Sequence, residues 1–154
     1  IRDSPVTGVQ TCALPILGQV TAIFSSRLLD RDEVSAAHGG RIKTYTNLNA
    51  MLKNPSIDVI DVTSYPYQHP DHVVAAAKAG KHLIIEKPLC LSKKDLRRMV
   101  SAVKKTGVKT CVCFECRFSG EFLTLKAVID KGLIGKIHYG EVDYYHGVGP
   151  WYGQ

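Results

Sequence analysis

The sequence predicts an α/β fold organised around a parallel sheet. Short aliphatic segments alternate with helical segments of roughly 8 to 14 residues. The loops between them are short, which favours right-handed crossovers joining parallel strands. One aliphatic segment, His82–Ile85, ends directly in Glu86-Lys87-Pro88. Because the carboxyl ends of parallel strands face the ligand crevice, Glu86 and Lys87 are candidate site residues.

The first half of the chain shows two strand–helix pairs. The sequence predicts a strand over residues 19–25, a helix over 30–37, a brief strand over 42–45 and a short helix over 47–52. Acidic residues open the helix over 30–37, and Gly39-Gly40 ends it. Thr46 is expected to cap the short helix, which stops before Asn54-Pro55.

The second half repeats the pattern. It predicts strands over residues 57–63, 82–85 and 108–114 and helices over 69–78 and 93–105. The His82–Ile85 strand is expected to be buried on both faces. Ser92 is expected to cap the basic helix, whose predicted apolar stripe consists of Leu96, Met99, Val100 and Val103.

The pattern changes after Arg117. A helix over residues 121–131 and a long alternating strand over 136–145 predict the beginning of a second α/β domain with a more open sheet. We therefore expect a first domain over residues 17–118 and part of a second over 119–154.

Composition excludes several protein classes. Hydrophobic residues make up 45% of the 154 residues and charged residues 22%. No apolar run approaches the roughly 18 residues needed to span a bilayer, so a membrane protein is not expected. The net charge is +6, and many of the basic residues fall on the helix over 93–105. That helix is a nucleic-acid patch or, as we prefer, a solvated face.

Cysteine and histidine do not form a convincing metal site. Five cysteines without regular spacing argue against a disulfide scaffold and fit a reducing, cytoplasmic setting. We interpret Cys111, Cys113 and Cys116 as buried thiols on a strand, because structural zinc needs four ligands. His69 and His72 could share a helix face but lack a nearby third ligand.

The first sixteen residues have neither helical nor strand periodicity. Val6–Ile16, VTGVQTCALPI, resembles the in-frame translation of a sequencing adapter, so we expect residues 1–16 to be an artefact or a poorly ordered terminus. Sequencing the gene from an intact template would show whether native DNA encodes this segment.

A dinucleotide-binding sheet should open with a strand and a Gly-x-Gly-x-x-Gly turn, whose backbone amides approach the pyrophosphate. The chain has no such turn; Gly147-Val-Gly149 has bulky neighbours and no helix behind it. In the doubly wound, Rossmann-type strand order 3-2-1-4-5-6, the absent first strand lies at the centre of the sheet. We therefore expect a marginally folded, inactive fragment.

Several motifs together resemble the Gfo/Idh/MocA family of NAD(P)-dependent oxidoreductases. They are the strand from Asp58, His69, Ala75-Ala-Ala-Lys-Ala-Gly-Lys-His82 and Glu86-Lys87-Pro88. Phe114-Glu-Cys-Arg117-Phe118 and Gly132-Leu-Ile-Gly-Lys-Ile137 extend the resemblance, which covers about Leu17 to Tyr145. The resemblance implies a Rossmann domain followed by an α/β domain with a large open sheet.

The resemblance also implies site residues. Lys87 resembles the family's lysine near the nicotinamide and the reacting hydroxyl, and Glu86 its partner beside the nicotinamide ribose. Pro88 restricts Lys87 and allows a cis bond. The remaining cofactor-binding candidates are Ser26, Arg27, Thr63, His69 and Arg117. The family's usual Thr-Pro-Asn before the histidine is replaced by Ser64-Tyr65-Pro66.

The implied reaction is hydride transfer between NAD(P) and a secondary alcohol of a sugar or cyclitol. Arg27 favours NADP over NAD, unless it is an ordinary surface arginine. The family's acid–base histidine belongs to a region beyond Gln154. For the full-length parent we expect a homo-oligomer with a carbohydrate-like substrate and with neither a nucleic-acid nor a membrane partner. A non-catalytic nucleotide sensor and a basic nucleic-acid binder are the alternatives.

Overall fold

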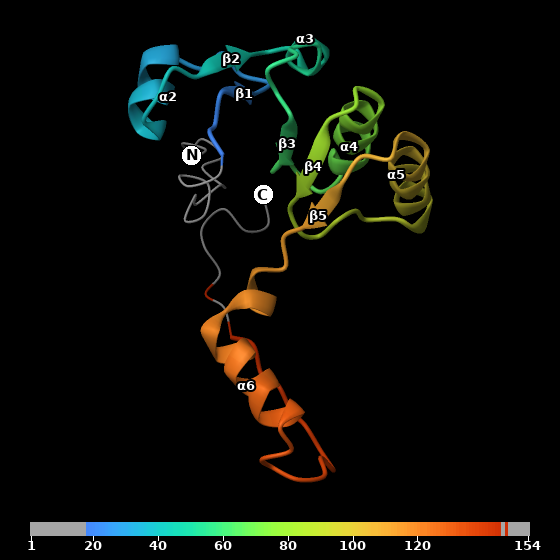
Figure 1. Ribbon diagram of the computed structural model, residues 1–154. Coiled ribbons are helices and arrows are strands. Elements are labelled where there is room, and N and C mark those ends of the chain that lie inside the picture. The colour runs from blue at the N-terminus through green and yellow to red at the C-terminus, as the bar shows by residue number, and fades with distance from the viewer. Residues whose placement is uncertain (1–17, 146, 148–154) are drawn as a thin grey trace. The chain divides into compact units, whose positions relative to one another are not determined.

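The structure is a computed structural model that describes residues 18–145 and residue 147 (Figure 1). The chain divides into two compact units, Ile1–Phe114 and Glu115–Gln154. The first unit contains the strands β1 (Ala22–Phe24), β2 (Lys43–Tyr45), β3 (Val59–Val62), β4 (His82–Ile85) and β5 (Thr110–Val112). Its helices are α2 (Arg31–His38), α3 (Leu48–Leu52), α4 (His69–Lys78) and α5 (Lys93–Thr106).

All strand pairs in the first unit are parallel, which confirms the predicted α/β fold. β1 pairs with β2, while β3, β4 and β5 form a separate three-stranded sheet in that order. Within residues 18–145, no strand joins β1 to β3. The break falls where the Rossmann strand order predicts the missing first strand.

The hydrophobic core lies on one face of the three-stranded sheet. Side chains alternate along a strand, so Ile60 and Val62 of β3 share a face with Leu83 and Ile85 of β4, and all four are buried. α4 and α5 pack side by side against this sheet (Figure 1). They contribute Val73, Ala76, Ala77 and Met99 to the same cluster.

The opposite face of this sheet is less covered. Val59 is 46% exposed, and Ile84 is half-buried. The prediction that His82–Ile85 is buried on both faces is therefore wrong, because helices cover only one face among the described residues. For the same reason Cys111 of β5 is exposed and Cys113 half-buried, and Cys116 is exposed in a turn of 3-10 helix. These thiols are not buried as predicted.

Local capping explains where the helices begin and end. The Asp30 carboxylate accepts from Asp32 N and Glu33 N at the start of α2, and Ser92 accepts from Asp95 N at the start of α5. Gly39 and Gly107 end these helices in the left-handed conformation. α3 begins one residue later than predicted, because Asn47 rather than Thr46 is its cap.

Several predicted strands were too long, and one apolar stripe is only partly buried. β1, β3 and β5 are clearly shorter than predicted, because each pairs with only one neighbouring strand among the described residues. On α5, Met99 is 3% exposed and Val103 packs against the core, whereas Leu96 and Val100 are 38% and 42% exposed.

In the described part of the second unit, a short 3-10 segment, η1 (Glu115–Phe118), is followed by the helix α6 (Gly120–Asp130). Ser119 caps α6 by accepting from Phe122 N. The predicted strand over residues 136–145 is wrong: these residues form no strand, and a strand needs a neighbour to satisfy its backbone groups. None of the described helices is long and apolar enough to cross a membrane.

Candidate cofactor-binding edge

The Glu86-Lys87-Pro88 motif lies at the carboxyl end of β4, as predicted. Glu86 N donates to Val62 O of β3 (3.0 Å), so the motif begins as an extension of the parallel ladder. The Glu86 carboxylate turns back and accepts from Lys87 N (3.0 Å). Lys87 is exposed, and its bond to Pro88 is cis. The lysine side chain therefore begins at the edge of the sheet where parallel α/β proteins bind ligands.

The neighbouring strand, β3, continues into Thr63 and a loop over residues 64–68. Val62 is opposite Ile85 in the parallel register, so Thr63 emerges beside Glu86. Gln68 N donates to Tyr65 O (2.8 Å), and Tyr65 N donates to Gln68 Oε1 (3.3 Å). These two bonds close the loop into a defined turn next to Glu86 and Lys87.

Two histidines of α4 contact this loop through Ser64. His69 is completely buried and its Nε2 donates to Ser64 O (2.7 Å), because a carbonyl oxygen only accepts. His72 Nδ1 lies 2.8 Å from Ser64 Oγ. His69 Nδ1 is buried and has no hydrogen-bond partner among the described residues. The predicted site residue His69 therefore contacts the loop, and its ring is shielded from solvent.

His72 also connects this loop to the end of β1. Its ring meets the Phe24 ring edge-on, with centroids 5.8 Å apart. Burial lowers the pKa of His72, as does the neighbouring His69, while Asp71 opposes the shift. The neutral imidazole is therefore favoured, which suits a hydrogen bond with Ser64 Oγ and an aromatic contact.

Asp61 is an ionisable residue that sequence reasoning did not select. It lies on the less covered face of β3, opposite Ile84. Burial, and secondarily the charge of Glu86, raise its pKa to about 6. One carboxyl oxygen is buried and has no partner among the described residues. The alternation in Asp58-Val-Ile-Asp61-Val was a usable signal, because it puts an acid in the middle of a strand.

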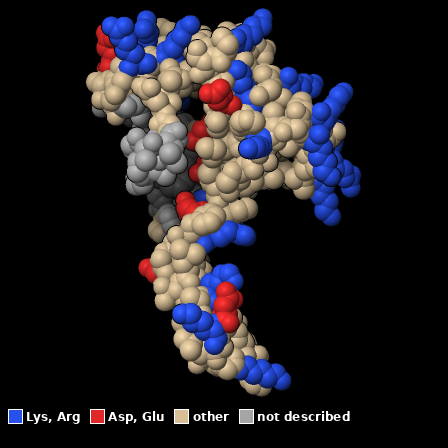
Figure 2. Space-filling model, viewed as in Figure 1, with Lys and Arg blue, Asp and Glu red and all other residues tan. Residues whose placement is uncertain are grey.

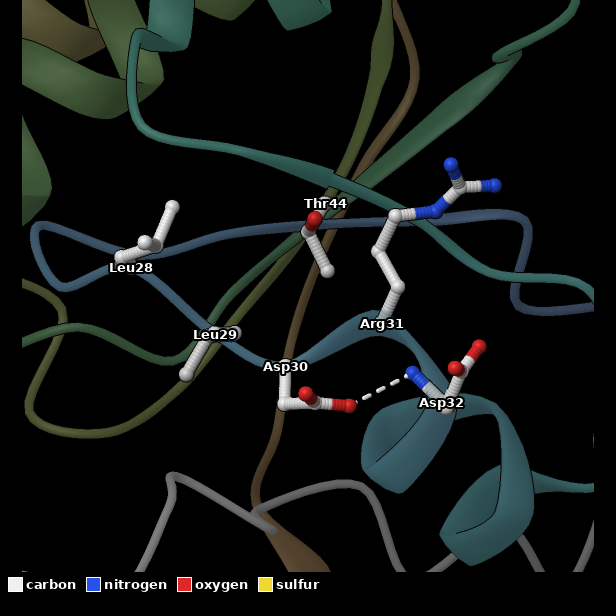
Figure 3. A pocket seen from close by; sticks show the side chains of 6 residues that line it. All are labelled: Leu28, Leu29, Asp30, Arg31, Asp32 and Thr44. Atoms are coloured by element: carbon white, nitrogen blue, oxygen red, sulfur yellow. Dashed lines mark hydrogen bonds between the residues drawn. The ribbon is translucent and has the colours of Figure 1, made fainter.

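Ser26 and Arg27 follow the carboxyl end of β1, as predicted, and both are exposed. Arg27 N donates to Ser25 Oγ (3.1 Å), which bends the chain toward α2. The next residues line an open hollow of about 590 Å³, bounded by Leu28, Leu29, Asp30, Arg31, Asp32 and Thr44 (Figure 3). Sequence reasoning missed this hollow because Leu28 and Leu29 form no periodic pattern.

Two acids, Asp30 and Asp32, and one base, Arg31, line the hollow. Figure 3 shows the Asp30 carboxyl directed at the backbone N–H of Asp32, and the distance from Asp32 N to Asp30 Oδ1 is 2.8 Å. The Arg31 side chain extends alongside Thr44. The carboxylate oxygen that accepts from Asp32 also accepts from Glu33 N (2.9 Å). Asp30 is therefore occupied in capping α2.

Arg117 lies in η1 of the second unit and is exposed. It belongs to the second unit, and its prediction as a cofactor-binding residue stays a prediction. Within the described parts of the chain, no group of three or more His, Cys, Asp or Glu residues could hold a metal ion. His146, whose role the sequence left open, lies outside the described residues.

Basic side chains gather over α5 (Figure 2). Arg98 is the most engaged of them. It donates to Asp71 of α4 (2.7 Å) and to Asp95 (2.9 Å), and these hydrogen bonds raise its pKa. Arg98 therefore has a structural role, because it connects the exposed sides of α4 and α5.

The described residues fit the two ends of a dinucleotide better than its middle. The hollow after β1 offers apolar walls and a guanidinium group for an adenosine end. The β3–β4 edge offers Thr63, Glu86 and Lys87 for a nicotinamide ribose end. The glycine-rich turn that would hold the pyrophosphate does not occur in residues 18–145.

Comparison with known families agrees with this geometry. The model of an oxidoreductase family with an NAD-binding Rossmann fold, Gfo/Idh/MocA, matches residues 6–114. The chain belongs to this family. The chain is similar to the myo-inositol 2-dehydrogenase of Thermotoga maritima, to which it is 38% identical over 96 residues, which are 62% of this chain and 29% of the relative.

Two further similarities extend this result. The scyllo-inositol 2-dehydrogenase (NADP(+)) of Bacillus subtilis is 29% identical over 82% of this chain and 34% of its own length. The crystal structure of a probable dehydrogenase from Thermotoga maritima matches with a TM-score of 0.71 and 32% identity, over 79% of this chain and 37% of that one. The chain thus spans about a third of the length of these similar proteins.

Proposed function

We propose that this chain is the cofactor-binding part of an NAD(P)-dependent dehydrogenase that acts on a secondary alcohol of a sugar or cyclitol. The observation that carries the proposal is the placement of Glu86 and Lys87 at the carboxyl end of β4, beside the loop after β3. Relatives named as inositol dehydrogenases support the substrate class. The active unit is the whole parent protein.

In that enzyme the bound nicotinamide would supply the hydride chemistry. The Lys87 ammonium would polarise the reacting oxygen and stabilise negative charge that develops on it. Glu86 would orient this edge, because its carboxylate already binds the Lys87 amide. His69 would act as a positioning residue, since its ring is fully buried and holds Ser64 O.

The end of β1 would select between the two cofactors. Arg27 and Arg31 are both within the segment that follows β1, and a guanidinium suits a 2′-phosphate. Ser26, between β1 and Arg27, would contact the same ribose. The Asp30 carboxylate is turned toward the start of α2, where one of its oxygens accepts from two backbone amides. We therefore propose NADP rather than NAD.

The direct test is to titrate the 154-residue chain and matched variants with NADPH and NADH. The fluorescence of the reduced cofactor reports binding. We expect weak binding, because the pyrophosphate floor is absent from the described residues. Lys87→Met should weaken NADPH binding, whereas Lys94→Met on α5 should not. Equal losses in both variants, or losses only in Lys94→Met, would show that NADPH binds the basic helix as a polyanion and would overturn the proposal.

A further inference from the structure

The loop after β3 presents two tyrosines that the core does not use. Tyr65 and Tyr67 are 64% and 66% exposed, although a tyrosine ring usually buries much of its area in a fold. Their rings stack with planes 8° apart and centroids 5.7 Å apart. The two rings are therefore nearly parallel, and most of the surface of each tyrosine is open to solvent.

The pair is held in place by contacts that do not involve the rings. Pro66, between the two tyrosines, restricts the backbone. Gln68 closes the turn through its backbone N–H and its side-chain oxygen. Buried His69 and half-buried His72 hold Ser64, the residue before the pair. The two exposed rings thus stand on a loop that is fixed at both ends.

The position of the pair relates it to the cofactor-binding edge. The loop leaves β3 beside the Glu86 end of β4, so it borders the edge from which Lys87 emerges. An aromatic ring offers a flat apolar face, and the tyrosine hydroxyl adds a donor and an acceptor at its rim. A saturated polyol ring has the complementary surface, with C–H groups on its faces and hydroxyl groups around it.

We propose that Tyr65 and Tyr67 form a stacking wall for the ring of a sugar or cyclitol substrate. This inference rests on the proposed function and names a substrate-contacting pair for it. A fixed aromatic wall would orient the ring next to Lys87 at low entropic cost, because the two tyrosines are already stacked and their loop already closed before the substrate arrives.

Saturation-transfer NMR on the 154-residue chain tests this wall, since the method detects weak ligands. The probe is myo-inositol, with and without NADPH. We expect transfer to its ring C–H protons and a roughly two- to tenfold reduction in Tyr65→Ala and Tyr67→Ala. Tyr65→Phe should retain most of the signal, because the ring face remains. Tyr139→Ala, which removes an exposed tyrosine of the second unit, is the control.

The outcomes separate this inference from the proposed function. If the alanine variants give the same inositol signal as the wild type and Tyr139→Ala, the stacking wall is wrong. If the chain binds NADPH but no inositol, the wall is also wrong and the cofactor assignment stands. If Tyr65→Ala and Tyr67→Ala lose NADPH and keep inositol, the pair contacts the cofactor instead. A chain that binds neither ligand contradicts both proposals.

Discussion

The two sheets of the first unit have the same parallel topology but very different cores. The three-stranded sheet β3–β5 is covered on one face by α4 and α5 and contributes Ile60, Val62, Leu83 and Ile85 to the core. In the two-stranded sheet, all three residues of β1 are only half-buried, and in β2 Lys43 is exposed. The neighbours of the strands differ accordingly: β4 lies between two strands and contacts α4, whereas β1 and β2 pair only with each other among the described residues.

The two ends of the proposed site therefore lie on sheets that differ in the burial of their side chains. The Glu86-Lys87 edge rises from the sheet whose strands contribute fully buried residues to the core. Ser26 and Arg27 rise from the sheet whose residues, such as Phe24, only pack against the core from its margin. Buried apolar area is the main stabilising contribution to folding. We therefore expect the nicotinamide end of the proposed site to be firmly built and the adenosine end to depend more on the bound cofactor.

Truncating a core side chain should show the largest difference in stability between the two sheets. Leu83→Ala, at a residue 2% exposed in the central strand β4, should lower the free energy of unfolding by about 2–5 kcal/mol. Ile23→Ala, at the half-buried centre of β1, should cost less than about 1.5 kcal/mol. Urea denaturation followed by circular dichroism measures both. Equal losses would show that the two sheets share one core.

The strand and helix order was predictable because it depends on local patterns. The bounds of α4 and β4 agree with the sequence prediction, since a glycine or a proline marks their ends. The strand predicted over residues 136–145 failed because strand formation also requires a neighbouring strand, which periodicity does not reveal. Burial of Cys111 failed for a related reason: the sequence does not show which face of a sheet is covered.

The candidate site was predictable in part. Lys87, Glu86 and Thr63 were found from strand ends and from family resemblance, and the structure puts them on neighbouring strands. The enclosed position of His69 was not predictable, because a histidine at the start of a helix has the same sequence signal whether buried or exposed. The position of Asp61 in a strand was visible in the alternation of the sequence. Its burial and the hollow after β1 depend on tertiary contacts, which local patterns do not show.

The next largest effect concerns the histidine behind the loop. His69→Ala removes the donor to Ser64 O and opens a cavity, and we expect a loss of about 1–3 kcal/mol of unfolding free energy from the unpaired carbonyl alone. The same substitution should also weaken NADPH binding, because Ser64 precedes the site loop. Denaturation and NADPH titration of the variant check both effects. An unchanged NADPH affinity would remove His69 from the proposed site.

A smaller effect should appear as a pH dependence centred on β3. Since the pKa of Asp61 is raised to about 6, the folded chain binds this proton more tightly than the unfolded chain does. The Asp61 contribution to stability is therefore full below about pH 4 and is lost as the pH rises through 6. Asp61→Asn should remove this decline and raise stability at pH 8.

The Asp61 experiment compares denaturation midpoints of wild type and variant from pH 4 to 8. The difference between the two proteins isolates Asp61 from His72, whose lowered pKa acts in the opposite direction and is present in both. A constant difference across this pH range would contradict the raised pKa. Glu121→Gln, on α6 of the second unit, serves as a control for a carboxylate at a distant place in the sequence.

The smallest expected effect on stability comes from a surface contact between α4 and α5, the helices that cover the β3–β5 sheet. Asp71→Asn breaks the contact between Arg98 and Asp71, whose side chains are 45% and 76% exposed. Exposed ion pairs contribute little because water and salt screen them. We expect no measurable shift of the denaturation midpoint at physiological salt. A large shift would mean that the exposed contact between α4 and α5, rather than the buried cluster, stabilises the packing of these helices.

The central claim is that NADPH binds the carboxyl edge of β3 and β4. Two-dimensional amide NMR of the isotope-labelled chain during NADPH titration tests it most directly. We predict the largest chemical-shift changes at Thr63, Ser64, Glu86 and Lys87, with smaller changes near Ser26 and Arg27. Changes confined to the basic face of α5, with the β3–β4 edge unaffected, would contradict the account.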